Sequence, residues 1–308
     1  MYLEHYGFKH APFNLSPDPD CLYLSSKHRV GLSMLQYGLS ESGGGLTVIT
    51  GDVGAGKTTL LRKMLQTLDY QRLNVGVINN TMGFEEHLIR WVVSAFKLPY
   101  EDKDDIALFR LFQQYLIDQY ARGKQTVLIV DEAQNLLAKS LEELRLLTNI
   151  NAERDQLLKI VLLGQPELLA LLSKPELSQI AQRVSVEYHL EPLNLDDTHH
   201  YVRHRLEVAG GDPETFSAKA IDVVFYLSGG VPRLINTLCD YALLYGFANG
   251  TVKISFKSLL ESAQGRRIGG INHHGRNNPA RREVGKILAD EEGIDLDALF
   301  PNPTTAQQ

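Results

Sequence analysis

The sequence has few cysteines and no long apolar run. Its two cysteines, Cys21 and Cys239, lie far apart and neither belongs to a C-x-x-C pair, so they indicate neither a disulfide framework nor a zinc site. The longest apolar runs, such as TVLIV at residues 126–130, are much shorter than the ~20 residues of a membrane-spanning helix. The N-terminal MYLEHYGFKHAPF lacks the basic and apolar segments of a signal peptide. We therefore expect a soluble protein in a reducing cytoplasm.

The chain also lacks an excess of positive charge. Its 31 Lys and Arg residues are outnumbered by 37 Asp and Glu residues, which gives a formal net charge of −6. This balance argues against a protein that binds nucleic acid wholly by electrostatic attraction, but it leaves room for a local basic patch. With 44% hydrophobic and 22% charged residues, the composition is that of a globular protein long enough for about two domains.

A glycine-rich stretch near the N-terminus matches a phosphate-binding pattern. Residues 51–58, GDVGAGKT, fit G-x-x-x-x-G-K-[ST]. An apolar, β-branched run at 46–50 precedes the stretch, and leucines at helical spacing follow it over 58–68. A glycine-rich turn that only joins a strand to a helix is the alternative. The combination of motif and flanks favours a phosphate-binding loop.

This loop predicts a site for ATP or ADP with Mg²⁺. The backbone N–H groups of residues 54–57 would form a nest for phosphate at a helix N-terminus. Lys57 would contact the β and γ phosphates, and the Thr58 hydroxyl would bind the metal. The expected nucleotide-binding residues are Gly51, Asp52, Val53, Gly54, Ala55, Gly56, Lys57, Thr58 and Thr59.

Two acidic residues directly follow the apolar run TVLIV. In P-loop enzymes an Asp at the end of such a strand binds Mg²⁺, so Asp131 is the second expected metal ligand. The adjacent Glu132 is placed to orient and deprotonate the attacking water. Two acids that merely end a strand and face solvent are the alternative. The pair lies 74 residues after Lys57 with one strand pattern between, an arrangement of NTPases of the additional-strand class, and it predicts ATP hydrolysis.

Gln165 is a third candidate for this site. It follows the strand pattern at 159–164. If that strand lies between the P-loop strand and the Asp131 strand, the Gln165 amide would sense the γ-phosphate or position water. A turn residue before Pro166 is an equally good interpretation.

Two arginines are candidates on different grounds. Arg183 ends a helical pattern just before the last strand pattern, where it could project across a subunit boundary or instead neutralise the helix C-terminus. Arg233 follows Pro232 at a helix start. A cation there is unfavourable with the helix dipole, so it requires an anionic partner, either a nucleotide phosphate or an acidic side chain.

Strand and helix patterns alternate over residues 27–192, which predicts an α/β domain with a parallel sheet and right-handed crossovers. The strand patterns lie at 46–50, 74–80, 126–130, 159–164 and 184–190. The helical patterns lie at 26–42, 58–68, 84–96 and 104–122, from Ser140, where Ser140 and Glu143 form an S-x-x-E capping box, and from the QPE turn to Arg183.

The rest of the chain divides into three segments. Residues 1–26 are expected to be an irregular lead-in, because APFNLSPDPD is rich in turn-forming residues. Residues 193–264 carry only helical patterns, at 196–209, 217–227 and 232–248, and predict a smaller helical domain. Residues 265–308 are polar and glycine-broken, and we expect a flexible tail that is first basic and then acidic.

Together these motifs resemble those of AAA+ ATPases, and specifically of the ExeA (general secretion pathway protein A) family. The likeness runs through YGFKHAPFNLSPDPDCLYLS, GDVGAGKTTL, VLIVDEAQNL, LRLLTNI, LLGQPEL, QRVSVEYHLEPL, YVRHRLEVAG and GGVPRLIN, and covers nearly all of residues 1–263. The resemblance implies an AAA+ P-loop NTPase fold, in which helices sandwich a parallel sheet of the additional-strand class and a helical lid domain follows.

The resemblance also implies roles for the candidate residues. Residues 51–58 would be the Walker A loop, and Asp131 with Glu132 the Walker B pair. Gln165 would occupy the sensor 1 position, although AAA+ proteins commonly have Asn, Ser or Thr there. Arg183 would be an arginine finger that acts in trans, and Arg233 would be sensor 2.

The resemblance further implies a nucleotide-dependent motor or switch that forms a homo-oligomer with sites at subunit interfaces. Family members with a secretion role can carry a transmembrane helix and a peptidoglycan-binding domain after the ATPase. This chain is more similar to the shorter branches found with type IV pilus biogenesis (MshM-like) or with exosortase (PEP-CTERM) and exopolysaccharide loci. The expected partner is thus an envelope secretion, pilus or polysaccharide machinery, and the expected location is the cytoplasm or the inner face of the inner membrane.

A DNA-associated AAA+ ATPase, similar to transposition regulators, is the alternative function. Its support is the basic stretch at 266–286, which could contact DNA or an anionic membrane surface.

Overall fold

The computed structural model describes residues 2–15, 21–40, 42–79, 87–150, 156–266, 271–272 and 278–301. The chain divides into two compact units. The sheet unit comprises Ser26–Asp52 and Lys57–Leu190. The helical unit comprises Met1–Ser25, Val53–Gly56 and Glu191–Gln308.

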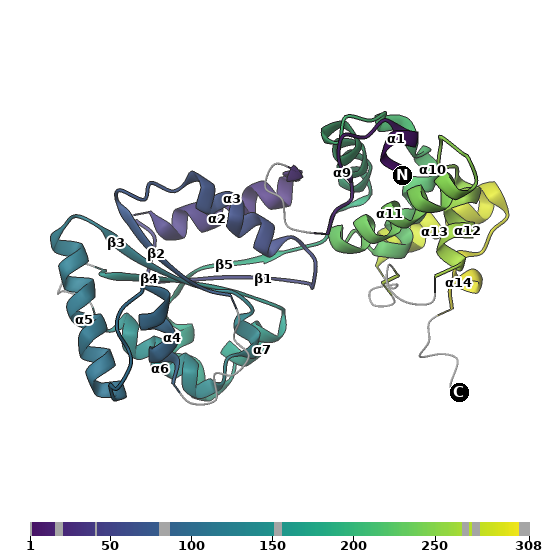
Figure 1. Cartoon of the computed structure of the whole chain (residues 1–308). Coiled ribbons are helices and arrows are strands. Elements are labelled where there is room, and N and C mark those ends of the chain that lie inside the picture. Colours follow the sequence, from purple (N-terminus) through teal and green to yellow (C-terminus); the bar gives the residue numbers. More distant parts are fainter. Residues whose placement is uncertain are drawn as a thin grey trace. The chain divides into compact units, whose positions relative to one another are not determined.

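Five parallel strands form one sheet in the sheet unit, in the order β2-β3-β4-β1-β5 (Figure 1). The strands are β1 (Leu46–Gly51), β2 (Leu73–Ile78), β3 (Gln125–Val130), β4 (Leu158–Gly164) and β5 (Val184–Leu190). Every residue of β1 and β4 is buried, as continuous apolar runs predict for strands that are covered on both faces. The strand β4 lies between β1 and β3, which confirms the additional-strand order.

Helices cover both faces of this sheet (Figure 1). On one face, α2 (Ser26–Leu39) and α3 (Lys57–Thr67) pack against each other and against β1. The helices of the other face are α4 (Leu88–Ala95), α5 (Asp105–Ala121), α6 (Ala138–Thr148) and α7 (Glu167–Leu172). Their leucines and aromatic residues share one core with the strands. The predicted α/β sandwich is therefore confirmed.

The predicted capping box at the start of α6 is wrong. The helix begins at Ala138, and its N-cap is Leu137, whose side chain makes no capping hydrogen bond. Ser140 lies inside the first turn and is buried, so it cannot serve as the N-cap. Ala138 and Lys139 are good helix formers, which extends the helix past the expected start.

The single helix predicted from the QPE turn to Arg183 is interrupted. After α7 the chain forms the 3-10 turn η3 (Pro175–Leu177) and the short helix α8 (Ser178–Ala181). Pro175 explains the break, because proline lacks the backbone N–H that a continuing helix needs and clashes with the preceding turn.

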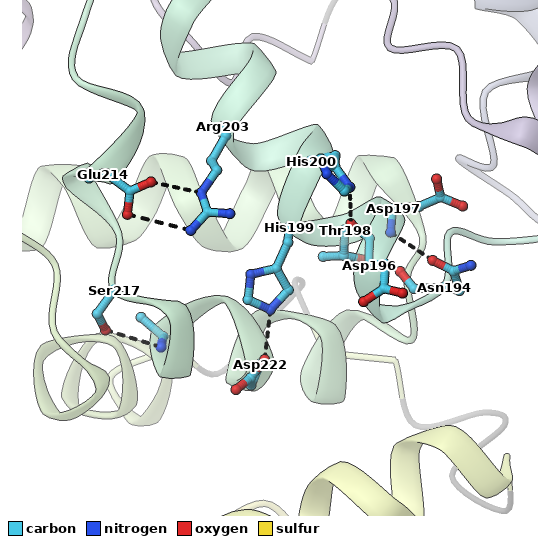
Figure 2. Close-up of polar contacts among 11 residues, drawn as sticks. Asn194, Asp196, Asp197, Thr198, His199, His200, Arg203, Glu214, Ser217 and Asp222 are labelled. Atoms are coloured by element: carbon cyan, nitrogen blue, oxygen red, sulfur yellow. Dashed lines mark hydrogen bonds and ion pairs between the residues drawn. The ribbon is translucent and has the colours of Figure 1, made fainter.

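Four helices form the centre of the helical unit: α9 (Leu195–Val208), α10 (Ala218–Ser228), α11 (Pro232–Ala248) and α12 (Phe256–Gln264). Asn194 and Ser217 cap α9 and α10, since each side-chain oxygen accepts a hydrogen bond from a first-turn backbone N–H (Figure 2). His199 Nε2 of α9 lies 2.7 Å from Asp222 Oδ1 of α10, and this contact joins the two helices. Most of α10 is buried, which makes it the central helix of the unit.

The lead-in belongs to the core of the helical unit. It contains a short helix, α1 (Tyr2–Tyr6), where sequence analysis expects irregular chain. Phe8 and Phe13 are buried in the same core as α10 and α11, and the Phe13 ring meets Phe216 edge-on. Burial of these aromatic residues explains why the segment does not remain a loose extension.

The expectation of a flexible tail from residue 265 is wrong for residues 279–300. These residues form α13 (Pro279–Glu292) and α14 (Leu296–Leu299), whose apolar side chains enter the core of the helical unit. Arg281 is 2% exposed, and its Nε donates to the carbonyl oxygen of Tyr226 at 2.9 Å. The Tyr226 hydroxyl in turn donates to Asp297 at 2.6 Å. Residues 267–270 and 273–277 of the predicted basic stretch lie outside the described residues.

None of the helices in the described part of the chain combines the length and the apolar character that crossing a bilayer demands.

Candidate functional site

The P-loop connects β1 to α3, as its sequence predicts. Gly54 and Gly56 have φ angles of +81° and +104°, a region that favours glycine over residues with a Cβ. The helix α3 begins at Lys57, so its first backbone N–H groups lie next to the loop. The loop thus ends on a helix N-terminus, where aligned peptide dipoles favour a bound anion.

Lys57 is held by the loop itself. Its side chain is 7% exposed, and its Nζ donates to the carbonyl oxygens of Gly51 at 2.6 Å and Asp52 at 3.0 Å. Burial lowers the pKa of Lys57, while the neighbouring carboxylates of Glu132 and Asp131 oppose that shift. The Lys57 ammonium therefore interacts electrostatically with both Glu132 and Asp131.

The two expected metal ligands are in contact. The Thr58 hydroxyl donates to Asp131 Oδ2 at 3.0 Å, and Asp131 Oδ1 accepts from the backbone N–H of Glu132 at 2.9 Å. Burial raises the pKa of Asp131, and these two hydrogen bonds work against the shift. A hydroxyl and one carboxylate are hard oxygen donors that suit Mg²⁺, which usually binds to one or two carboxylates, phosphates and water. No cluster of three His, Cys, Asp or Glu side chains exists among the described residues to compete for a metal.

Glu132 lies beside Asp131 with an unusual backbone. Its φ of 55° and ψ of 36° are left-handed, and it precedes the 3-10 turn η2 (Ala133–Asn135). Its carboxylate oxygen Oε2 accepts from the Gln134 amide at 2.7 Å and lies 3.5 Å from the Gln165 amide. Gln134 also accepts a hydrogen bond from the backbone N–H of Gln165 at 2.9 Å.

Sequence reasoning placed Gln165 in this site and missed Gln134. Because β4 neighbours β3, the residue that follows β4 comes close to the acids that follow β3. Gln165 also begins the turn into α7, since its carbonyl oxygen accepts from the backbone N–H of Leu168 at 2.9 Å. Gln165 therefore lies beside Glu132 and also begins a turn, so these two interpretations of the residue are compatible.

Arg183 lies apart from these residues. It precedes β5 and therefore sits at the amino-terminal edge of the parallel sheet, whereas the P-loop and Asp131 follow the carboxyl ends of their strands. Its guanidinium donates to Thr148 Oγ1 at 2.8 Å and to the side-chain oxygen of Asn149. These contacts are with side chains at the C-terminus of α6, and not with the carbonyl groups of the helix that precedes Arg183.

Arg233 belongs to the helical unit, at the second position of α11. Pro232 occupies the first position, as predicted. Within the same unit, the backbone N–H of Arg233 donates to the carbonyl oxygen of Gly54 at 3.3 Å. A Cβ at Gly54 would lie 2.5 Å from the Arg233 Cβ, so glycine is needed for this approach. Among the described residues of the helical unit, no carboxylate forms an ion pair with Arg233.

The chain is similar to known proteins in sequence and in fold. The family described as "AAA domain" matches residues 40–172, which include the P-loop and the acidic pair. General secretion pathway protein A of Aeromonas hydrophila is 44% identical over 255 residues, which are 82% of this chain and 46% of that protein. The chain thus spans about half the length of this relative.

Three solved structures share the fold at low sequence identity. The Aeropyrum pernix ORC2 protein has a TM-score of 0.63 at 15% identity, with 95% of this chain and 82% of that chain covered. Cdc6p from Pyrobaculum aerophilum has a TM-score of 0.59 at 17% identity, with 85% and 70% covered. Domain III of the Thermotoga maritima replication initiation protein DnaA has a TM-score of 0.53 at 17% identity, with 81% and 96% covered.

Proposed function

We propose that this chain is an AAA+ ATPase that hydrolyses ATP to ADP and phosphate, because residues 40–172 match the AAA domain family and the chain is similar to general secretion pathway protein A. One observation carries the proposal: the P-loop lysine, the Thr58 hydroxyl and the Asp131-Glu132 pair meet at one edge of the sheet. Phosphate recognition alone would need only the loop. A buried metal-ligand pair with a second carboxylate beside it is what hydrolysis requires.

Different residues of the sheet unit would bind the phosphates, hold the metal and activate the water. The backbone N–H groups at the start of α3 and the Lys57 ammonium would bind the phosphates, with Lys57 leaving the carbonyl oxygens of Gly51 and Asp52. Thr58 and Asp131 would hold magnesium, which when bound reduces the charge of the phosphate oxygens. Glu132 would orient the attacking water and accept its proton.

The proposal is tested by replacing Glu132 with Gln. The amide keeps the size of the side chain but cannot accept the proton, so we expect turnover to fall roughly 100-fold to 10,000-fold. Binding of Mg²⁺-ATP, measured by equilibrium titration with a fluorescent analogue, should stay within a factor of about two, because Glu132 is assigned no ligand role. Wild-type turnover in Glu132→Gln would refute the assignment of the general base.

We further propose that the active form is an oligomer in which Arg183 serves the site of a neighbouring subunit. The seven residues of β5 separate Arg183 from the P-loop edge, a length of about 20 Å at ~3.3 Å per residue. Within the sheet unit, Arg183 is therefore too far from the P-loop edge to contact a phosphate that its own chain binds there. Its contacts with Thr148 and Asn149 would have to be exchanged for a partner's phosphate.

Mixed oligomers test the role of Arg183. Arg183→Ala subunits keep an intact nucleotide site, and Lys57→Ala subunits keep the arginine. If the site is shared, mixing two inactive variants restores part of the activity in a ratio-dependent way. Absence of rescue at every ratio, with mixed oligomers shown to form, contradicts the shared site.

The partner proposed is an envelope machinery for secretion, pilus assembly or polysaccharide export, which the ATPase would serve as a motor or switch from the cytoplasmic side. This rests on the likeness to general secretion pathway protein A, of which the chain spans 46%. The DNA-associated alternative is not favoured. Arg281 of the predicted basic stretch is buried, and Arg266 lies over the ring of Tyr241, so both cations serve packing within the helical unit.

A further inference from the structure

Gln134 connects the carboxylate of Glu132, the proposed general base, to the backbone of Gln165. Its Nε2 donates to Glu132 Oε2 at 2.7 Å, and its Oε1 accepts from the backbone N–H of Gln165 at 2.9 Å. A carboxylate can only accept and a backbone N–H can only donate, so the chemistry of the two partners fixes the orientation of the amide. One side chain thus links the ends of β3 and β4.

The left-handed backbone at Glu132 makes this link possible. In a regular helix residues i and i+2 do not face each other, so Glu132 and Gln134 would point apart. With a φ of 55° at Glu132, the chain turns and the η2 segment brings the Gln134 amide back onto the carboxylate. Non-glycine residues adopt this backbone only where surrounding contacts hold it, and such residues cluster at functional sites.

Gly164 supplies the space for the second contact. A Cβ at this position would lie 3.1 Å from Gln134 Oε1 and 2.8 Å from the Leu168 side chain. The last residue of β4 therefore leaves room for the Gln134 amide next to the Gln165 backbone. The turn at Glu132, the amide of Gln134 and the glycine of β4 form one arrangement.

We propose that Gln134 is a positioning residue that holds the Glu132 carboxylate in the orientation needed to engage the attacking water. The inference rests on the proposed ATPase function. Two amide groups approach the same oxygen, Oε2, at 2.7 Å and 3.5 Å, which limits the orientations that the carboxylate can adopt. The contact to the Gln165 backbone anchors the Gln134 amide at the end of β4, so the general base keeps a constant position relative to Asp131 within the sheet unit.

The test uses two variants that break the link differently. Gln134→Leu removes both hydrogen bonds. Gln134→Glu keeps an acceptor for the Gln165 N–H but places a second carboxylate beside Glu132, so the fold is maintained while the base is displaced. We expect both to lower single-turnover ATP hydrolysis by up to about 100-fold, as displaced catalytic groups do, with the Kd for Mg²⁺-ATP unchanged within a factor of about two. Gln114→Leu, an exposed glutamine on α5, is the matched control and should retain wild-type turnover.

A double variant separates positioning of Glu132 from a general structural effect. If Gln134 acts through Glu132, adding Gln134→Leu to Glu132→Gln lowers the residual turnover no further. A further loss in the double variant, or a large loss of ATP affinity in Gln134→Leu, overturns the inference. Wild-type turnover in both Gln134 variants together with an impaired Glu132→Gln overturns the inference alone, whereas wild-type turnover in Glu132→Gln removes the proposed function as well.

Discussion

Two buried lysines lie at opposite edges of the sheet, and their surroundings differ. Lys57 follows the carboxyl end of β1, and its Nζ bonds two carbonyl oxygens of the P-loop. Lys159 lies at the amino end of β4, and its Nζ donates to the carbonyl oxygens of Gly38 at 3.4 Å, of Ser40, and of Gly43 at 3.1 Å. Both side chains are less than 10% exposed, at 7% and 2%.

The two lysines differ in the kind of groups that surround their ammonium groups. Gly38 is in the last turn of α2, whose final carbonyl groups have no partner within the helix, so Lys159 caps a fixed helix end. Lys57 instead sits among carboxylates and loop carbonyls at the edge where phosphate would bind. One lysine satisfies the fold, whereas the other holds hydrogen bonds that a ligand can replace. Three substitutions test this contrast.

Lys159→Met is expected to destabilise the protein by about 3 kcal/mol, because several buried carbonyl oxygens lose their donor at once. Methionine fills a similar volume, so the loss reports the hydrogen bonds rather than a cavity. Urea unfolding followed by circular dichroism measures the change. Lys139→Met, an exposed lysine on α6, is the control and should change stability by less than about 0.5 kcal/mol. A loss below about 1 kcal/mol for Lys159→Met would contradict the capping role.

Lys57→Met should give the opposite pattern. We expect the Kd for ATP to rise about thirtyfold, or about 2 kcal/mol, because a charge-assisted contact with phosphate is lost. Stability without nucleotide should change little: burial lowers the pKa of Lys57 below 10.5, so its charged form costs folding free energy at neutral pH, which offsets its two hydrogen bonds. Calorimetric titration and thermal unfolding measure the two effects. Unaltered ATP affinity would show that the loop does not bind phosphate through Lys57.

The contrast between the lysines was not predictable from the sequence. The P-loop motif identifies Lys57, and the acids after β3 follow from their strand pattern. Lys159 belongs to a strand pattern, and only the packing of β4 beside α2 shows which groups its ammonium meets. The contact of Gln134 with Glu132 was not predictable for a similar reason, since it depends on the left-handed backbone of Glu132 rather than on residue spacing.

The structure of the C-terminal segment was also not predictable, in this case from its composition. Polar composition predicted a flexible tail, yet Val284 and Leu288 stand four residues apart on α13 and are buried. Arg281, which counted as surface charge in the sequence, is a buried hydrogen-bond donor to α10. Composition averages over the few side chains that determine packing, so a short apolar stripe within a charged segment was outweighed.

Asp131→Asn extends the comparison to an acid that interacts with Lys57. We expect it to raise stability, by less than Lys159→Met lowers it. Burial raises the pKa of Asp131 above 3.8, so the folded state holds its proton more tightly than the unfolded state. Its contribution to stability therefore falls as pH rises from about 3.8 through the raised pKa, and at neutral pH the ionised side chain costs folding free energy. The variant should gain roughly 1 kcal/mol at pH 7 without ligand.

The asparagine can still accept from the Glu132 N–H, so the local backbone should be retained. The gain should shrink as the pH is lowered toward 4, which urea unfolding at several pH values measures. Dependence of ATP binding on Mg²⁺ should weaken in the same variant, since a neutral amide is a poorer ligand than a carboxylate. A loss of stability at pH 7 would mean that the Thr58 and Glu132 hydrogen bonds outweigh the burial of the charge, and that the site is as much a part of the fold as Lys159.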